Sequence, residues 1–164
     1  MGPMTETRWL TEQEQGVWRA FISAVDAFVD HLERQVQRDS NMPYTYYEIL
    51  VALSEAPDRT LRMSDLAGAR SSSRSRLSHA VARLEEVGWV RRLACPTDKR
   101  GALAQLTDEG FAALKEAAPG HVTAVREKLF DRLTPEQVTA LGEISQALLT
   151  GLPEGAARRQ ALNR

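Results

Sequence analysis

Basic and hydroxyl-bearing side chains gather in one short segment, residues 70–101 of the 164-residue chain. The segment holds eight basic and three acidic residues, a net charge of +5, whereas the whole chain carries −1 and the remainder therefore −6. A localised cationic segment in an otherwise acidic chain attracts a polyanion. The chemistry available to these residues is binding of phosphates and base edges; the ordinary alternative is a solvated, charged surface.

Within this segment, residues 74–87 divide on a helical wheel into an apolar face and a small, polar, basic face. The apolar face consists of Leu77, Ala80, Val81, Leu84 and Val87. On the opposite face, small residues permit close approach to a DNA major groove, and Arg and His side chains reach base edges. Hydroxyls and free amides at the helix entry can bind phosphate. The candidate DNA-binding residues here are Ser71, Ser72, Ser73, Arg74, Ser75, Arg76, Ser78, His79 and Arg83.

We expect Ser75, Arg76, Ser78 and His79 to read bases, and the remaining candidates to hold phosphates. A brief helix over residues 65–69, capped by Ser64, precedes them across a polar turn, which makes a helix-turn-helix.

The runs 89–95 and 102–106 flank a Pro/Asp/Gly turn and predict a β-hairpin. A helix-turn-helix followed by such a hairpin is a winged helix. The hairpin tip would carry Asp98, Lys99 and Arg100, where cations can enter a narrow minor groove.

Longer amphipathic patterns flank the winged helix. Thr11 and Glu14 have the spacing of a capping box, and apolar residues then recur every three or four positions as far as Val36. Pro119 and Gly120 interrupt a second helical pattern, where we expect a kink. The first helix is apolar over a face broader than one neighbour covers, so we expect a second copy of the chain to cover it in a two-fold homodimer.

The expected fold class is mostly α (α+β): a winged helix-turn-helix lobe with a two-stranded β-hairpin wing, plus N- and C-terminal helices that form a dimerisation lobe. Residues 1–4, Met-Gly-Pro-Met, fit a remnant of expression cloning within a disordered or extended arm. The boundaries that we predict are an arm at 1–10, a single domain at 11–150 with dimerisation helices at about 11–38 and 107–150 and a winged helix at about 44–106, and a polar tail at 151–164.

Five motifs in this order resemble the MarR family of transcriptional regulators (multiple antibiotic resistance regulators). They are Leu-Arg-Met-Ser-Asp-Leu-Ala at 61–67, Ser-Arg-Leu-Ser at 75–78, Arg-Leu-Glu-Glu-Val-Gly-Trp-Val-Arg-Arg at 83–92, Pro-Thr-Asp-Lys-Arg-Gly at 96–101 and Leu-Thr-Asp-Glu-Gly at 106–110. The resemblance implies a homodimer that binds pseudo-palindromic double-stranded DNA and represses transcription until a small ligand releases it.

The resemblance also implies roles for single residues. The helix from Arg74 resembles the major-groove recognition helix of the family, and Arg100 resembles its minor-groove wing arginine with Asp98 as the orienting partner. Lys99 stands where many members have arginine, and a phosphate contact tolerates either residue.

The family often binds aromatic acids between its two lobes. The aromatic or titratable residues nearest that crevice by sequence position are candidates for contacting a small aromatic or phenolic effector: Trp18, His31, Tyr44 and Tyr47. The alternative is that the apolar members of this group are simply core.

Other classes of protein have little support. No catalytic, zinc or phosphate-loop motif is present, so we expect neither an enzyme nor a cofactor. The longest apolar run is five residues, Ile49 to Leu53, which excludes a membrane span. A single cysteine, Cys95, excludes an internal disulfide, fits a cytoplasmic setting and is best explained as a small apolar filler. The competing hypothesis is a sensor of a ligand or a metal that acts through a protein partner. Its metal would be held by His31 and His121 together with carboxylates.

Overall fold

The computed structural model describes residues 6–70, 74–95 and 101–151, without the side chains of residues 68–70 and 74. Helices dominate it, and a small antiparallel sheet completes it, as the sequence predicts. The elements are α1 (Glu12–Ser40), α2 (Tyr44–Glu55), the 3-10 turn η1 (Pro57–Arg59), β1 (Thr60–Arg62), α3 (Met63–Arg70), α4 (Arg74–Glu86), β2 (Val90–Ala94), β3 (Ala102–Leu106), α5 (Asp108–Lys128), the 3-10 turn η2 (Phe130–Arg132) and α6 (Pro135–Gly151).

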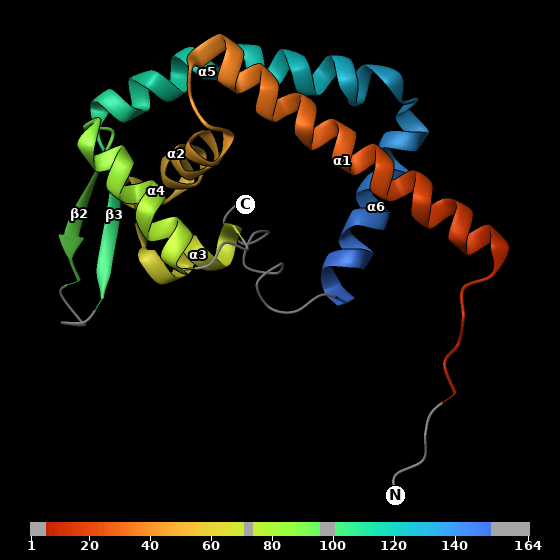
Figure 1. Cartoon of the computed structure of the whole chain (residues 1–164). Helices are drawn as coiled ribbons and strands as arrows, with labels where there is room; N and C mark the ends of the chain where they lie inside the picture. Colours follow the sequence, from red (N-terminus) through yellow and green to blue (C-terminus); the bar gives the residue numbers. More distant parts are fainter. Residues whose placement is uncertain (1–5, 71–73, 96–100, 152–164) are drawn as a thin grey trace, which may run out of the picture.

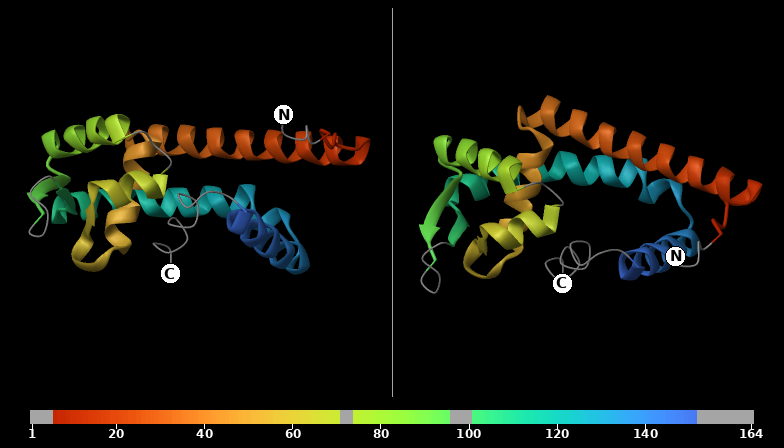
Figure 2. Two further views of the ribbon diagram at one scale, coloured as in Figure 1. Left: turned by 90° about the horizontal axis from the view of Figure 1, so that it is seen from below. Right: turned by 60° about the horizontal axis from the view of Figure 1, so that its bottom comes forward.

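Two long helices, α1 and α5, run side by side as an arm, and the winged-helix lobe hangs from one end of that arm (Figure 1). This lobe gathers α2, α3, α4 and the sheet. α6 turns back below the other end of the arm, and Figure 2 shows the same separation from two further directions. The elements of the lobe follow one another in the sequence. α1 and α5 contact each other although the whole lobe lies between them in the sequence.

The start and end of α1 follow from local chemistry. The Glu14 amide donates to Thr11 Oγ1 at 3.2 Å, and the Thr11 amide donates to Glu14 Oε2 at 2.7 Å, so the capping box is present. The helix ends at Ser40, where Asn41 adopts the left-handed conformation that asparagine tolerates well (φ 48°).

The core of the winged-helix lobe is built from three helices and the sheet. Leu50 and Leu53 of α2, Leu66 of α3 and Leu84 of α4 are fully buried in one cluster. Burial of side chains of this size is the main force that holds the lobe together, at roughly 2 kcal/mol each. Two local details differ from expectation. Val87 is 57% exposed because α4 ends one residue earlier, and Ser64 lies inside α3 because that helix begins at Met63.

The predicted hairpin is present, and a third strand joins it. β2 pairs antiparallel with β3, from Val90 opposite Leu106 to Ala94 opposite Ala102. The other edge of β3 pairs with β1, so the strand order is β1-β3-β2 and β2 is an edge strand. β1 comprises Thr60–Arg62, and Met63 already belongs to α3.

The link from the sheet to α5 is unusually close. The Thr107 amide donates to the Trp89 carbonyl at 3.0 Å, and the Thr107 hydroxyl donates to the Gly88 carbonyl at 2.7 Å. The same hydroxyl accepts from the Gly110 amide at 3.0 Å and caps α5. A Cβ atom on Gly110 would stand 2.1 Å from the Trp89 carbonyl oxygen, so only glycine fits there.

An aromatic cluster joins the arm to the lobe. Tyr44 and Tyr47 of α2 stack with their ring centroids 6.1 Å apart, and His121 of α5 lies 4.6 Å from Tyr47 and 5.8 Å from Tyr44. The Nδ1 atom of His121 is buried without a hydrogen-bond partner in the described part of the chain. Burial lowers the pKa of His121, and it raises the pKa of Tyr47 together with the charge of Glu55.

Apolar side chains stay exposed on the two helices farthest from the lobe. On α1 they are Val17, Trp18, Phe21, Val25 and Val29, and on α6 they are Ile144 and Leu148. Among the described residues, no helix combines the length and the apolar character needed to cross a membrane. α5 continues from Asp108 to Lys128 with Pro119 inside it, and the kink expected there stays a prediction.

Replacing Gly110 with alanine should destabilise the protein by about 2 kcal/mol or more, because the new methyl group overlaps the Trp89 carbonyl. Urea unfolding followed by circular dichroism measures this change. Gly142→Ala in α6 is the control: its Cβ meets open space, so it should leave stability unchanged or raise it by about 0.5–1 kcal/mol. Equal stability of the Gly110→Ala variant and the parent would contradict the close approach.

His121 should make stability fall in mild acid. Its folded pKa lies below the unfolded value of 6.5, so the unfolded chain takes up the proton first. The contribution of neutral His121 is therefore complete above pH 6.5 and is lost as the pH falls from there through the folded pKa. Between pH 8 and pH 5, the free energy of unfolding of the parent should fall more than that of His121→Gln. His31 and His79 are present in both proteins, so the difference between the two isolates His121. A parallel loss in the two proteins would refute this.

Candidate nucleic-acid interface

Most of the candidate base-reading residues share one exposed face of α4. Ser75, Arg76, His79 and Arg83 are exposed. On the other side of the helix Leu77, Ala80, Val81 and Leu84 are buried in the core, as the wheel predicts. A helix anchored by one apolar face presents the other face at a fixed angle, which is what reading a groove requires.

A surface hollow of about 600 Å³ adjoins this face. Arg76, His79 and Arg83 line it on the α4 side, and Pro43, Thr45 and Tyr46 line it at the start of α2. Inspection of the sequence did not single out Thr45 or Tyr46, because residues thirty positions away become neighbours of α4 only through the packing of α2. Thr45 and Tyr46 thus lie beside the cationic face of α4.

Arg83 already has an anionic neighbour. Its Nη1 atom lies 2.7 Å from Glu86 Oε2, and this hydrogen bond together with the charge of Glu86 raises the pKa of Arg83. Both side chains are well exposed, so solvent screens the pair and it contributes little to stability. A phosphate can therefore replace Glu86 as the partner of Arg83 at little cost.

Ser78 is placed differently from the other candidates. It is half-buried, and its hydroxyl and carbonyl oxygens accept from Arg92 Nη2 of β2 at 3.3 and 2.7 Å. The carboxylate of Glu85 lies beside the same guanidinium, 3.2 Å from Arg92 Nε. Ser78 thus faces the wing strand, and neither Glu85 nor Arg92 was among the candidate site residues.

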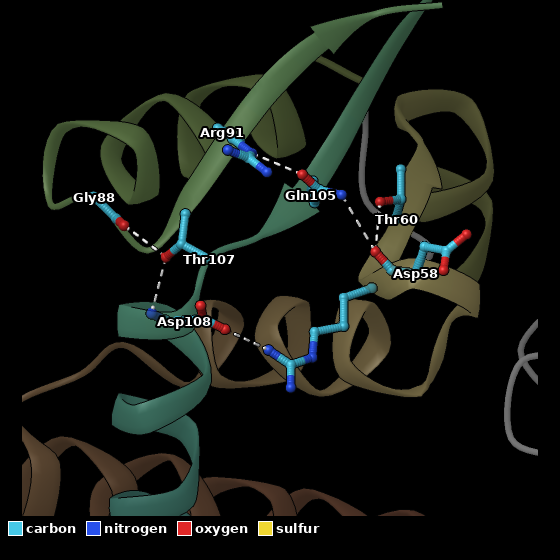
Figure 3. Close-up of polar contacts among 9 residues, drawn as sticks. Asp58, Thr60, Gly88, Arg91, Gln105, Thr107 and Asp108 are labelled. Atoms are coloured by element: carbon cyan, nitrogen blue, oxygen red, sulfur yellow. Dashed lines mark hydrogen bonds and ion pairs between the residues drawn. The ribbon is translucent and has the colours of Figure 1, made fainter.

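Polar contacts hold the base of the wing on its other face (Figure 3). Arg91 Nε donates to Gln105 Oε1 at 2.7 Å, and Gln105 Nε2 donates to the Asp58 carbonyl at 3.4 Å. Below them, Arg59 bonds Asp108 at 3.1 Å and stacks on the Phe111 ring at 3.9 Å. These contacts cross from β2 through β3 to η1 and α5, and they involve no residue of α4.

The rest of the predicted site falls outside the described residues. This applies to the turn residues Ser71, Ser72 and Ser73, to the side chain of Arg74, and to Asp98, Lys99 and Arg100 of the wing. The strands that lead to the wing are described, and the Cys95 amide donates to the Gly101 carbonyl at 3.2 Å across its neck. Cys95 itself is buried, as expected for an apolar filler.

The effector candidates do not share one pocket. Tyr44 and Tyr47 lie together with His121, which sequence inspection left out because nothing in its spacing connects it to α2. His31 lines a separate hollow of about 370 Å³ between α1 and α5. Trp18 is 55% exposed, about 20 Å farther along α1 at 1.5 Å per residue. No cluster of three or more metal-ligating side chains occurs in the described ranges.

Comparison with known proteins agrees with this geometry. A family model described as MarR family matches residues 40–101. The crystal structure of Sco3205, a MarR family transcriptional regulator from Streptomyces coelicolor in complex with DNA, is similar at 59% identity. Its TM-score is 0.86, with 90% of this chain and 92% of that chain covered.

Two curated relatives match over a shorter stretch. The transcriptional regulator PecS of Dickeya dadantii is 31% identical over 110 residues, which cover 66% of this chain and 66% of PecS. The transcriptional repressor MprA of Escherichia coli strain K12 is 27% identical over 110 residues, which cover 67% of this chain and 62% of MprA. The chain thus spans just under two thirds of the length of these relatives. With the winged helix, the long arm and the near-complete match to the Streptomyces regulator, the chain belongs to the MarR family.

Proposed function

We propose that this protein is a sequence-specific, double-stranded DNA-binding transcriptional regulator without enzymatic activity, working in the cytoplasm. The observation that carries the proposal is the exposed face of α4, which carries Ser75, Arg76 and His79 on a helix that is followed directly by a β-hairpin. A helix of this kind enters a major groove, with Arg76 and His79 long enough to reach base edges and Ser75 small enough to allow contact. The DNA complex of Sco3205, 59% identical, supports the same mode of binding.

Phosphate contacts would set the register of this helix. Arg83 at the rim of the exposed face, Arg74 and the serine turn 71–73 are the candidates. The wing residues Lys99 and Arg100, with Asp98 orienting the arginine, would extend the contact into the neighbouring minor groove.

The exposed apolar faces of α1 and α6 support a homodimer. Residues such as Val17, Phe21 and Ile144 are 42–64% exposed in the single chain, and a second copy would bury them. Two-fold symmetry would present two α4 helices to successive major grooves, so the operator would be pseudo-palindromic with half-sites about 10 bp apart.

We further propose repression relieved by a small aromatic or phenolic effector. A dimer seated on a promoter competes with the transcription machinery, and the relative MprA is itself named a repressor. Tyr44 and Tyr47 stand where α2 meets α5, so a ring inserted there would change the angle between lobe and arm. Each lobe carries one α4, so this angle sets the spacing of the two helices.

Fluorescence anisotropy tests the proposal directly. Duplex DNA from the region upstream of the gene should bind more tightly than random duplex, by a factor of about 10³ or more, and both affinities should fall steeply with salt. Weak binding to both duplexes at low salt would contradict DNA regulation and favour a sensor that acts through a protein partner.

Arg76→Ala should weaken binding to the preferred duplex by about 1–3 kcal/mol, with a much smaller loss on random duplex, because a base contact discriminates between sequences. Arg91→Ala is the matched control: it removes the same charge from the same lobe, but from a side chain bonded to Gln105 on the other face of the wing. An equal loss on both duplexes would make Arg76 a phosphate contact instead.

A further inference from the structure

Arg92 joins the wing to the middle of the recognition helix through four contacts. Its Nη2 atom donates to the Ser78 carbonyl and hydroxyl oxygens at 2.7 and 3.3 Å. Its Nε atom lies 3.2 Å from Glu85 Oε2, and its backbone amide donates to Glu85 Oε1 at 2.9 Å. One guanidinium and one amide thus occupy both oxygens of Glu85 and both oxygens of Ser78.

The spacing on α4 makes this arrangement fit. Ser78 and Glu85 are seven residues apart, two turns of an α-helix, so they lie on the same face. That face lies between the buried side, marked by Leu77 and Leu84, and the exposed side that carries His79. The contacts of Arg92 with Ser78 and Glu85, called the clamp from here on, therefore lie beside the surface proposed for DNA and do not occupy it.

The position of β2 explains why the wing needs a second attachment. α4 reaches β2 through only Val87, Gly88 and Trp89, with Gly88 in the left-handed region at φ 84°. β2 is also an edge strand, and on the side away from β3 the Glu85 carboxylate receives the amide of Arg92. Without this clamp, the hairpin would be held to α4 only at that three-residue link and through side-chain packing.

We infer that Arg92 and Glu85 are a positioning pair: they fix the angle between the recognition helix and the wing, and thereby contribute to sequence selectivity without touching bases. This inference rests on the proposed DNA binding. A protein that must place a helix in a major groove and a wing in a minor groove at once gains affinity only where both fit. A hairpin held less firmly against α4 would discriminate less between sequences, and its advantage on the preferred site would shrink.

Charge-conserving substitutions separate this role from direct phosphate binding. Arg92→Lys keeps the positive charge but lacks the planar fork needed to reach Ser78 and Glu85 together. Glu85→Gln keeps the shape of the other partner and removes its negative charge. The matched control is Arg91→Lys, which makes the same change one residue earlier, where the side chain bonds Gln105 on the opposite face of the strand.

The measurement is the ratio of dissociation constants on random duplex and on the duplex that the parent protein selects from a random-sequence pool. Both constants are taken by anisotropy on one preparation, so any unfolded fraction cancels in the ratio, and thermal melts check the fold. Arg92→Lys and Glu85→Gln should each lower the ratio about tenfold, comparable with one mismatched base pair. The double variant should lose no more than either single variant, because both changes break one unit. Arg91→Lys should keep the parent ratio.

An unchanged ratio in Arg92→Lys and Glu85→Gln would overturn the inference. An equal loss on both duplexes in Arg92→Lys would also overturn it, because the loss would then not depend on the DNA sequence. If the parent itself failed to select any duplex from the pool, the proposed DNA-binding function would fail first, which is a different result from loss of the clamp.

Discussion

The contact on which the rest of this structure depends is the packing of the first turn of α5 against the carbonyl groups of Gly88 and Trp89. At that point α4 has just ended, the hairpin begins, and the long arm leaves the lobe. The Thr107 hydroxyl donates to the Gly88 carbonyl and accepts from the Gly110 amide, and the Thr107 amide donates to the Trp89 carbonyl. The absence of a side chain on Gly110 allows the approach. Any rotation of α5 is therefore transmitted to the base of the wing, because the two are joined through backbone atoms.

α4 distributes three tasks around its circumference. Leu77, Val81 and Leu84 anchor it in the core, while Arg76 and His79 face solvent beside the start of α2. Ser78 and Glu85 form the third face and hold Arg92 of β2. This division explains why a helix of only 13 residues can be both firmly fixed and available to a ligand.

The arm relates these local features to regulation. α1 and α6 carry the exposed apolar side chains on which the proposed dimer depends, and α5 contributes His121 to the cluster with Tyr44 and Tyr47. α5 contacts the wing base at one end and α1 along its length, so in the dimer that we propose a change at the cluster would alter the spacing of the two α4 helices. Burial disfavours the charged form of the imidazole in this cluster and lowers the pKa of His121.

The sequence by itself determined those features whose cause is local. The capping box at Thr11, the apolar face of α4 and the turn between two short strands each depend on residues within a few positions, so periodicity and turn chemistry predict them. They were enough to identify the winged helix and the exposed cationic face. Tertiary structure alone decided which residues from distant segments meet. It added β1 to the sheet, placed His121 on two tyrosines, separated Trp18 from them and turned Ser78 toward Arg92. These contacts depend on how helices pack across long stretches of chain, and packing is set by the volumes of many side chains together, which no short motif encodes.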